Sequence, residues 1–199
     1  NRDYELLVLR LSQEITLNRA TRSMDEVGRQ MDHPTVSQMI YPIMQMADIA
    51  LLGADAAVGG IDQRKIHMLA REHLVNFGYK APVCIHTPIL NGIDGKKMSS
   101  SQGNYISVAD SEEEIRKKCQ KAFCPPEIAE NPILQIFQHH VFPRLPQIII
   151  HRPEKFGGDR AFASYAELEA AYGKGEIHPL DLKKTCGESL VEILAPVRD

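Results

Sequence analysis

Hydrophobic residues in the first third of the chain recur at helical spacing. This periodicity predicts one long helix over residues 4–30. The Asp-His-Pro segment at 32–34 interrupts the pattern, because the residue before a proline disfavours helical backbone. A second helix is therefore expected over about residues 34–52, with Gly53 as its stop.

Two short apolar runs flank the next predicted helix. The runs lie at 56–58 and 82–86 and the helix at 61–77, which is the order of a βαβ unit. The uninterrupted apolar centre of the second run is typical of a parallel strand covered on both faces. Two parallel strands alone do not make a stable sheet. We therefore predict an α/β fold, the second half of a Rossmann-like doubly wound parallel sheet whose first half lies outside these residues.

The pattern becomes mainly α-helical after a long loop rich in Gly, Ser and Lys at 87–108. Helix starts are predicted where a capping residue or an N1 proline precedes a periodic segment: Ser111, Asn131-Pro132, Ser164 and Pro179. A short β-like run lies at 147–151, and Pro196 is expected to end the last helix. We place a domain boundary near residue 109, between domains 1–108 and 109–199.

Composition places the chain among soluble globular proteins. Of its 199 residues, 43% are apolar and 25% charged, and no apolar run approaches the about 18–20 residues of a membrane span. The chain begins at Asn1 without an initiator Met or a signal-peptide layout, so we expect it to begin within a longer reading frame. The cysteines form no CxxC pair, which favours reduced thiols and a cytoplasmic location: Cys84, Cys119, Cys124 and Cys186.

Charge and histidine spacing narrow the possible partners. A net charge of −3 gives no overall electrostatic reason to expect nucleic acid, so such a partner has to be argued from local patches. The adjacent His139 and His140 lack partners at ligand spacing, and no His/Cys cluster fits zinc. We therefore expect no tightly bound metal.

The loop segment at 95–104, Gly-Lys-Lys-Met-Ser-Ser-Ser-Gln-Gly-Asn, combines an ammonium group, hydroxyls and glycine-flanked amides. These groups suit a polyphosphate whose charge shifts during a reaction. The KMSSS string at 97–101 resembles the second signature of class I aminoacyl-tRNA synthetases, and it follows a βαβ unit as that signature requires. The resemblance implies catalytic roles for Lys97, Ser99 and Ser100. It also implies ATP contacts from Lys97, Met98 and Ser101.

Tyr41, Gln45 and Asp48 are spaced to share one face of the second predicted helix. With apolar neighbours, that face is either the polar lining of a pocket or a partly exposed polar stripe. The Y-x-x-x-Q-x-x-D pattern resembles tyrosyl-tRNA synthetases of the archaeal and eukaryotic type, in which it forms the amino-acid pocket. The resemblance implies that Asp48 accepts the phenol hydroxyl of the substrate, and that Tyr41 and Gln45 bind its α-ammonium group.

Gly59-Gly60 ends the first apolar run and opens the following helix. Backbone can approach a ligand closely there, and a helix N-terminus favours anions, although ordinary βα turns also carry glycines. The Gly-Gly-x-Asp-Gln segment resembles the same family. The resemblance implies that both glycines face the nucleotide, that Asp62 contacts the ribose hydroxyls and that Gln63 contacts tyrosine.

Basic residues flank this segment, and they form the local positive patch from which RNA binding can be argued. Arg22, Arg64 and Lys65 lie beside the proposed site, although surface cations are commonly just solvated. The resemblance implies that Arg22 and Arg64 help to recognise the first acceptor-stem base pair. A guanidinium is suited to contacts with both base edges and phosphates.

The C-terminal part resembles family segments that recognise the anticodon. Phe156 is suited to stack on an unpaired base, and Asp181 is suited to accept a hydrogen bond from a base edge. Core packing of Phe156 and a helix-first-turn role for Asp181 remain alternatives. His178 lies in the same matching segment and is a weaker candidate.

The resemblance as a whole implies a tyrosine-tRNA ligase. Such an enzyme activates L-tyrosine with Mg-ATP to tyrosyl-adenylate and transfers the tyrosyl group to tRNA(Tyr). Residues 1–108 would then be the C-terminal half of the catalytic domain and 109–199 the anticodon-recognition domain. The first class I signature, HIGH, is nowhere in the sequence, so we expect negligible activation by this chain alone.

The sequence alone does not decide the oligomeric state, and it leaves two alternative functions. The family resemblance favours a homodimer, and the apolar stripe of the helix at 4–15 is a candidate surface for a second subunit or for the absent half. A tryptophanyl-tRNA synthetase shares the architecture, but an indole offers Asp48 only an N–H and no hydroxyl. The other alternative is a non-catalytic RNA-binding paralogue, although such a protein has no need of the KMSSS loop.

Overall fold

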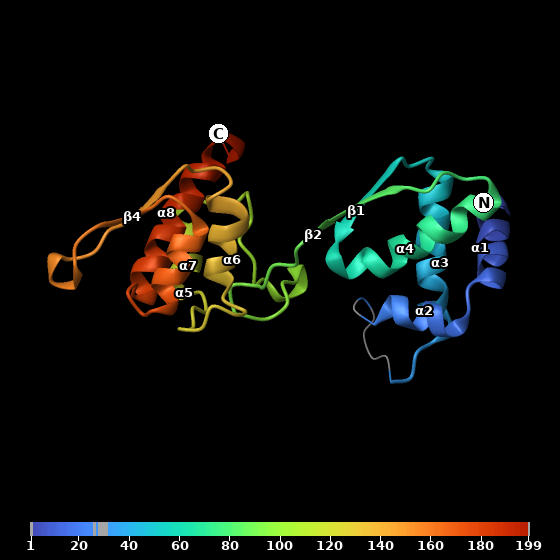
Figure 1. Cartoon of the computed structure of the whole chain (residues 1–199), viewed down its shortest axis with the longest axis horizontal. Coiled ribbons are helices and arrows are strands. Elements are labelled where there is room, and N and C mark those ends of the chain that lie inside the picture. The colour runs from blue at the N-terminus through green and yellow to red at the C-terminus, as the bar shows by residue number, and fades with distance from the viewer. Residues whose placement is uncertain (1, 26, 28–31, 199) are drawn as a thin grey trace. The chain divides into compact units, whose positions relative to one another are not determined.

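The computed structural model describes residues 2–25, 27 and 32–198 and shows mixed α and β structure (Figure 1). The chain forms two compact units, Asn1–Ile89 and Leu90–Asp199, called the N-terminal and C-terminal units below. The loop that carries the KMSSS string belongs to the C-terminal unit by this division. The functional boundary near residue 109 stays a prediction. Among the described helices, none is long and apolar enough to cross a membrane.

The N-terminal unit opens with two helices where the sequence predicted one. They are α1 (Arg2–Glu14) and α2 (Leu17–Met24). The prediction of a continuous helix over 4–30 is wrong, because Thr16 caps a new helix: its hydroxyl accepts a hydrogen bond from the Arg19 amide. Residues 26 and 28–30 of that predicted helix lie outside the described part of the chain.

Helix α3 (Val36–Leu51) is the central element of the N-terminal unit, and α1, α2 and α4 (Arg64–His73) all pack against it (Figure 1). A capping box of Thr35 and Gln38 starts α3 close to the predicted position. The apolar stripe of α1 faces this core, where Leu7 and Leu11 are buried. The stripe is therefore internal to the unit, and its prediction as a surface for a second subunit is wrong.

The predicted βαβ unit is confirmed. Strands β1 (Ala56–Gly60) and β2 (Val83–Thr87) pair in parallel, and Gly59 lies opposite His86. Between them run the 3-10 turn η1 (Ile61–Gln63), helix α4, and the 3-10 turn η2 (Leu74–Phe77). The carboxyl ends of both strands therefore meet at one edge of the sheet, beside the start of α4.

One face of this sheet is open in the described chain. Helix α4 packs on the strands, whereas Val58, Val83 and Ile85 are 67%, 59% and 50% exposed. The prediction that β2 is covered on both faces is therefore wrong for the described residues, because those three side chains point away from α4. The parallel strand pair and the mixed α and β structure around it agree with the predicted α/β class. The Rossmann-like, doubly wound sheet stays a prediction.

The C-terminal unit is mainly helical, with one short antiparallel strand pair (Figure 1). Its elements are α5 (Glu112–Lys121), α6 (Pro132–Ile136), the π-helical turn η4 (Phe137–Val141), β3 (Ile148–Ile150), η5 (Glu154–Phe156), β4 (Arg160–Phe162), α7 (Tyr165–Gly173) and α8 (Pro179–Arg198). Each predicted helix start is confirmed, as is the β-like run at 147–151. The strand β4 had no signal in the sequence that we recognised.

Two local predictions in this unit need correction. The Ser-x-x-Glu spacing of Ser164 and Glu167 predicts a capping box at the start of α7. The Ser164 hydroxyl caps α7, but the Glu167 carboxylate accepts from the amide of Ala163, so this box is only half formed. Helix α8 continues through Pro196 to Arg198. Pro196 has no N–H to donate to the carbonyl of Glu192, so the last turn of α8 lacks this hydrogen bond although the helix continues.

Helix α8 forms the core of the C-terminal unit together with α5, α6 and β3. Two thiols meet there, since Cys119 of α5 and Cys186 of α8 are both fully buried and hydrogen-bonded to each other. All four cysteines of the chain are free thiols.

Candidate functional site

The three residues of the predicted polar face of α3 differ in their exposure to solvent. Tyr41 is 47% exposed and Asp48 is also exposed, whereas Gln45 is only partly accessible. The amide nitrogen of Gln45 lies 3.4 Å from Nε2 of His67 on α4. Its amide oxygen is buried and has no hydrogen-bond partner in the described structure. A buried acceptor without a partner is costly, which is typical of a group that meets a ligand.

Asp48 already contacts a phenol that belongs to the chain itself. The hydroxyl of Tyr4, on α1, lies beside the Asp48 carboxylate, and its oxygen is 3.4 Å from the carbonyl oxygen of Met44. Burial, and then the negative charge of Asp48, raise the pKa of Tyr4. The sequence showed Tyr4 only as one position of an apolar stripe, so its contact with Asp48 was missed.

Glycines at the carboxyl end of β1 allow close packing against the start of α4. A Cβ atom on Gly59 would lie 3.1 Å from Cβ and Cγ of Gln63 and 3.3 Å from Cε1 of His67. A Cβ atom on Gly60 would lie 2.6 Å from Oδ1 of Asp62. The absence of side chains at both positions therefore lets Asp62, Gln63 and His67 lie against the strand end.

A pair of histidines lies directly behind this strand end. His67 is 2% exposed, and its Nδ1 lies 3.1 Å from Nε2 of His86 on β2. Burial, with a further contribution from the neighbouring His86, lowers the pKa of His67. His67 is therefore neutral at neutral pH. Neither histidine was singled out as a candidate from the sequence, where they appeared as isolated residues in a helix and a strand.

The KMSSS loop is organised around a buried side chain, Asn104. Its amide nitrogen donates to Oδ1 of Asp94 at 2.8 Å and to the carbonyl of Lys97 at 3.2 Å, and its amide oxygen accepts from the Ser99 amide at 2.8 Å. Asn104 is 6% exposed. The conformation of the loop from 94 to 104 thus depends on one side chain that the sequence did not single out.

The remaining KMSSS residues lie on the surface of this loop. Ser99 and Ser101 place their hydroxyl oxygens 2.9 Å apart, and Ser100 begins the 3-10 turn η3 (Ser100–Gln102). Hydrogen bonds from the Lys96 amide and from Asn104 lower the pKa of Asp94, which keeps this carboxylate ionised inside the loop. The loop thus presents its hydroxyls and cations outward from a hydrogen-bonded base.

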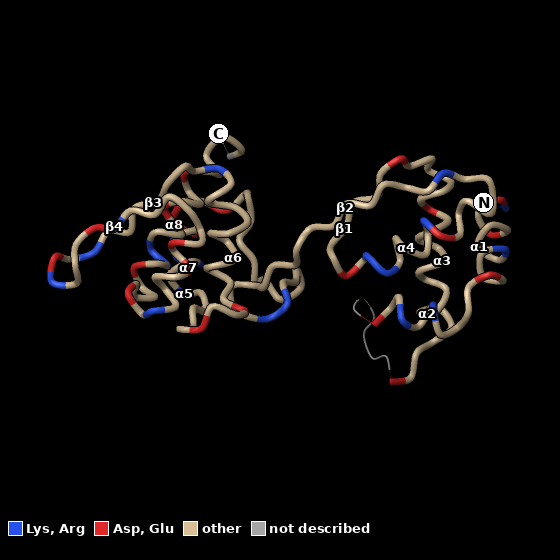
Figure 2. Tube along the Cα trace, in the orientation of Figure 1, with Lys and Arg blue, Asp and Glu red and all other residues tan. Residues whose placement is uncertain are grey.

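Basic side chains gather in a groove of the N-terminal unit. The groove is a cavity of ≈ 580 Å³ between α2 and the start of α4, and its charged lining residues are Arg19, Arg22, Asp25, Arg64 and Lys65. Figure 2 shows these cations on the two neighbouring elements. The structure therefore brings together the three basic residues predicted from the sequence and adds Arg19.

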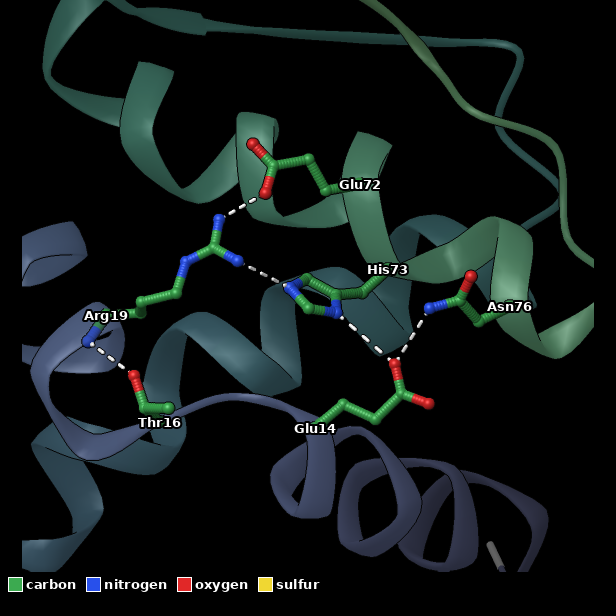
Figure 3. A network of polar contacts seen from close by, with 6 residues as sticks. All are labelled: Glu14, Thr16, Arg19, Glu72, His73 and Asn76. Atoms are coloured by element: carbon green, nitrogen blue, oxygen red, sulfur yellow. Dashed lines mark hydrogen bonds and ion pairs between the residues drawn. The ribbon is translucent and has the colours of Figure 1, made fainter.

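A network of polar contacts holds α2 in place beside this groove (Figure 3). Arg19 forms an ion pair with Glu72, and its Nη1 lies 3.0 Å from Nε2 of His73. The other ring nitrogen of His73 lies 3.3 Å from Glu14, which also accepts a hydrogen bond from Asn76 at 2.9 Å. The network links the α1–α2 junction to α4 and η2, and so it fixes the helix that carries Arg22.

The residues predicted to contact the anticodon share a cavity of ≈ 690 Å³ in the C-terminal unit. Phe156, His178 and Asp181 all line it. Phe156 is 63% exposed, which excludes the core-packing alternative for this residue. Asp181 lies in the first turn of α8, so its capping alternative stays open. Nδ1 of His178 accepts a hydrogen bond from the Leu180 amide at 3.2 Å, which is a local structural role.

A missed residue, Arg152, supports the rim of this cavity. It donates to the carbonyl of Gly158 at 3.0 Å and to the carbonyl of Glu176 at 2.7 Å. These bonds join the turn that carries Phe156 to the segment before α8. Elsewhere, the described residues include no group of three or more His, Cys, Asp or Glu side chains that could hold a metal ion.

Comparison with known proteins identifies the family. The family described as "tRNA synthetases class I (W and Y)" matches residues 1–195. The chain belongs to this family. The resemblance to class I aminoacyl-tRNA synthetases that the KMSSS loop and the α3 face indicated is therefore confirmed.

Several relatives in this family with high sequence identity are named tyrosine-tRNA ligase. A tyrosine-tRNA ligase of Methanospirillum hungatei JF-1 is 73% identical over 197 residues, which is 99% of this chain and 63% of the relative. The crystal structure of tyrosyl-tRNA synthetase complexed with L-tyrosine from Archaeoglobus fulgidus is 57% identical, with a TM-score of 0.83, and the match covers 100% of this chain and 62% of that one. The corresponding Pyrococcus horikoshii complex is 35% identical, with a TM-score of 0.85 over 100% and 62% of the two chains. The chain thus spans less than two thirds of the length of these synthetases.

Proposed function

We propose that this protein is a tyrosine-tRNA ligase, which joins L-tyrosine to tRNA(Tyr) in an ATP-dependent reaction. One observation carries the proposal: the polar face of α3 presents Tyr41, Gln45 and Asp48 in a chain 73% identical to a relative named tyrosine-tRNA ligase. Two crystal structures that it resembles are named as complexes with L-tyrosine. We assign residues 1–108 to the second half of a Rossmann-like, doubly wound catalytic domain.

The amino-acid site is assigned to α3 and the start of α4. Asp48 accepts the phenol hydroxyl of the substrate, consistent with its existing contact with the phenol of Tyr4. The buried, unpartnered oxygen of Gln45 accepts from the α-ammonium group, with the Tyr41 hydroxyl as a second partner. Gln63 contacts the same amino acid. Phenylalanine leaves the Asp48 carboxylate without its hydroxyl, so it is a poor substrate.

The ATP site is assigned to the end of β1 and to the KMSSS loop. Gly59 and Gly60 are assigned to face the nucleotide, and Asp62, which lies against Gly60, contacts its ribose. In the activation step a carboxylate oxygen of tyrosine attacks the α-phosphorus of ATP, and pyrophosphate leaves. Lys97, Ser99 and Ser100 stabilise the charge that develops on the leaving group, and Met98 and Ser101 contact ATP. Mg²⁺ enters with the ATP phosphates, and no resident metal is assigned to the described residues.

Transfer RNA is assigned to two surfaces. Arg22, Arg64 and Lys65 line the basic groove of the N-terminal unit, which suits the acceptor stem. The cavity of the C-terminal unit, lined by Phe156, His178 and Asp181, suits an unstacked anticodon base. We assign residues 109–199 to anticodon recognition on this basis.

Assembly and location follow from the family alone. We propose a homodimer in the cytoplasm, which the free thiols of all four cysteines are consistent with. The apolar stripe of α1 does not contribute to this proposal, because it is buried within the N-terminal unit.

The proposal is tested by ATP–pyrophosphate exchange with the natural full-length protein. We expect exchange with tyrosine, and at least about a hundredfold less with tryptophan or phenylalanine at equal concentration, since neither offers Asp48 a hydroxyl. Tyrosyl-tRNA synthetases are known to reject phenylalanine by about 10⁵-fold, so a hundredfold preference is a lower limit. Faster exchange with tryptophan would favour the tryptophanyl alternative. No exchange, together with tight RNA binding, would favour the non-catalytic paralogue.

A further inference from the structure

Gln45, His67 and His86 form a hydrogen-bonded chain from α3 through α4 to the end of β2. An amide nitrogen can only donate, so Nε2 of His67 is the acceptor in its 3.4 Å contact with Gln45. The proton of a neutral His67 is then on Nδ1, which donates to Nε2 of His86 at 3.1 Å. The donor direction is therefore fixed along the whole chain.

With its nitrogen toward His67, the Gln45 amide has its oxygen on the other side. Its nitrogen is occupied by His67, so its oxygen is the group that remains buried without a partner. An amide oxygen at that position attracts a cation. The opposite orientation would offer N–H groups there and would repel a cation.

We propose that His67 and His86 are positioning residues that hold the oxygen of Gln45 toward the α-ammonium group of the bound amino acid, as long as His67 is neutral. The inference rests on the proposed function for the identity of that amino acid. The two histidines do not contact the substrate themselves. They act through Gln45, and a neutral His67 is what makes the site selective for an ammonium group.

Protonation of His67 reverses its contact with Gln45 and leaves its donation to His86 unchanged. A charged imidazole has two N–H groups and no acceptor, so the Gln45 amide turns its oxygen to His67 and its nitrogen to the ligand. The titratable groups that face His67 are His86 and the Cys84 thiol, both from β2, whereas α3 presents the neutral Gln45 and β1 presents Gly59. The lowered pKa of His67 places this change below the ordinary value of 6.5.

The expected pH dependence follows directly. Affinity for tyrosine is complete at neutral pH, where His67 is neutral, and it falls as the pH drops through the lowered pKa of His67. The ligand keeps its ammonium charge over the whole range from about pH 8 to about pH 5, so the change belongs to the protein.

The test measures equilibrium binding of three phenols to the natural full-length protein: L-tyrosine, tyramine, which keeps the ammonium group, and 3-(4-hydroxyphenyl)propionate, which lacks it. We expect His67→Phe to weaken tyrosine and tyramine about tenfold and to leave the propionate unchanged, because one hydrogen bond to a charged group is lost. His67→Gln supplies a neutral acceptor. We expect it to restore most of the affinity at neutral pH and to abolish the acid loss.

Two further variants make the test specific. His73→Gln removes another part-buried histidine from α4 that contacts Arg19 and Glu14, and we expect wild-type affinities and the wild-type pH profile. His86→Leu removes the acceptor for His67 from a different element. We expect His86→Leu likewise to weaken the binding of tyrosine and tyramine and to leave the binding of the propionate unchanged. Thermal unfolding followed by circular dichroism shows whether each variant is folded.

The outcomes separate this inference from the proposed function. Equal weakening of all three phenols in folded His67→Phe and His86→Leu, or an unchanged acid loss in His67→Gln, overturns the inference and leaves the tyrosine ligase in place. A wild-type protein that binds none of the three phenols overturns both. Selective loss of the ammonium ligands, with a pH profile that depends on His67, supports the inference.

Discussion

At the scale of single residues, two features shape the candidate site: the absence of a side chain at Gly59 and the absence of a hydrogen-bond partner for the Gln45 oxygen in the described structure. Gly59 has no side chain, and the space this leaves is filled by Gln63 and His67. Gln45 in turn has an oxygen with no partner in the described structure. The absence of a side chain at Gly59 lets the end of β1 pack against α4. The unpartnered oxygen of Gln45 can accept a hydrogen bond from a ligand.

We expect Gly59→Ala to disturb this arrangement. The added methyl group would lie 3.1 Å from two carbons of Gln63 and 3.3 Å from Cε1 of His67, so both side chains have to move. The free energy of unfolding should fall by about 1–3 kcal/mol, the usual cost of overpacking, and the affinity for tyrosine should fall with it. Urea unfolding and equilibrium tyrosine binding measure the two effects.

Gly187→Ala is the matched control for this substitution. Its added methyl group would meet atoms of Arg116 and Cys119 at 3.4 and 3.5 Å, which is ordinary contact distance. Because Gly187 lies within α8, alanine should leave stability unchanged or raise it by up to about 1 kcal/mol. If Gly59→Ala were as well tolerated as Gly187→Ala, the close approach of β1 and α4 would not matter for the site.

At the scale of elements, the KMSSS loop is held by its base while its functional groups stay on the surface. The hydrogen bonds of Asn104 reach Asp94, Lys97 and Ser99, all within a single stretch of chain. Gly92 permits this packing, since a Cβ atom there would lie 2.3 Å from the Asn104 amide nitrogen. The loop therefore has a defined conformation although it carries little regular structure.

We expect Asn104→Ala to slow formation of the adenylate about tenfold while the affinity for tyrosine is retained. The loss of one ordering side chain, worth about 1–1.5 kcal/mol, leaves the loop amide and carbonyl groups without their partners. Single-turnover pyrophosphate release measures the rate, and equilibrium binding measures the affinity. The exposed Gln102 lies in the same loop, and Gln102→Ala should change neither quantity. A normal rate for Asn104→Ala would show that the loop is ordered by other means.

Much of the element pattern followed from the sequence because its causes are local. The helix starts at Ser111 and Pro179 and the βαβ order all depend on nearby residues. The break at Thr16 was missed because no glycine or proline marks it in the sequence. The His67–His86 pair and Asn104 were missed because their roles come from contacts between segments, which spacing along one helix does not show.

At the scale of the whole molecule, the chain carries two surfaces suited to RNA, one in each unit. They differ in chemistry: the groove beside α2 is lined by several cations, and the cavity beside α8 is lined by Phe156 and Asp181. Cations bind phosphates with a strong salt dependence, whereas stacking on an aromatic ring depends little on salt.

We expect the two surfaces to be distinguishable by the salt dependence of tRNA binding. Arg64→Ala should weaken binding and lower the slope of log affinity against log salt by about 1, because one phosphate contact is lost. Phe156→Ala should weaken binding about tenfold or more, with an unchanged slope. Filter binding of tRNA(Tyr) at several salt concentrations measures both quantities.

The exposed Arg10 of α1 lies outside the groove lining, and Arg10→Ala is the control for the loss of a positive charge. It should change neither the affinity nor the slope. A slope that fell equally for Arg10→Ala and Arg64→Ala would argue against a specific role for the groove.

The buried thiols between α5 and α8 make it possible to measure how often these two helices separate in the C-terminal unit. The hydrogen bond to Cys119, together with burial, raises the pKa of Cys186, so this thiol is both inaccessible and protonated in the folded unit. Alkylating reagents act on thiolates, so they modify Cys186 only when α8 separates from α5. The rate of that modification, compared with the rate at the partly exposed Cys84 and Cys124, follows the transient opening of the helix that carries Asp181.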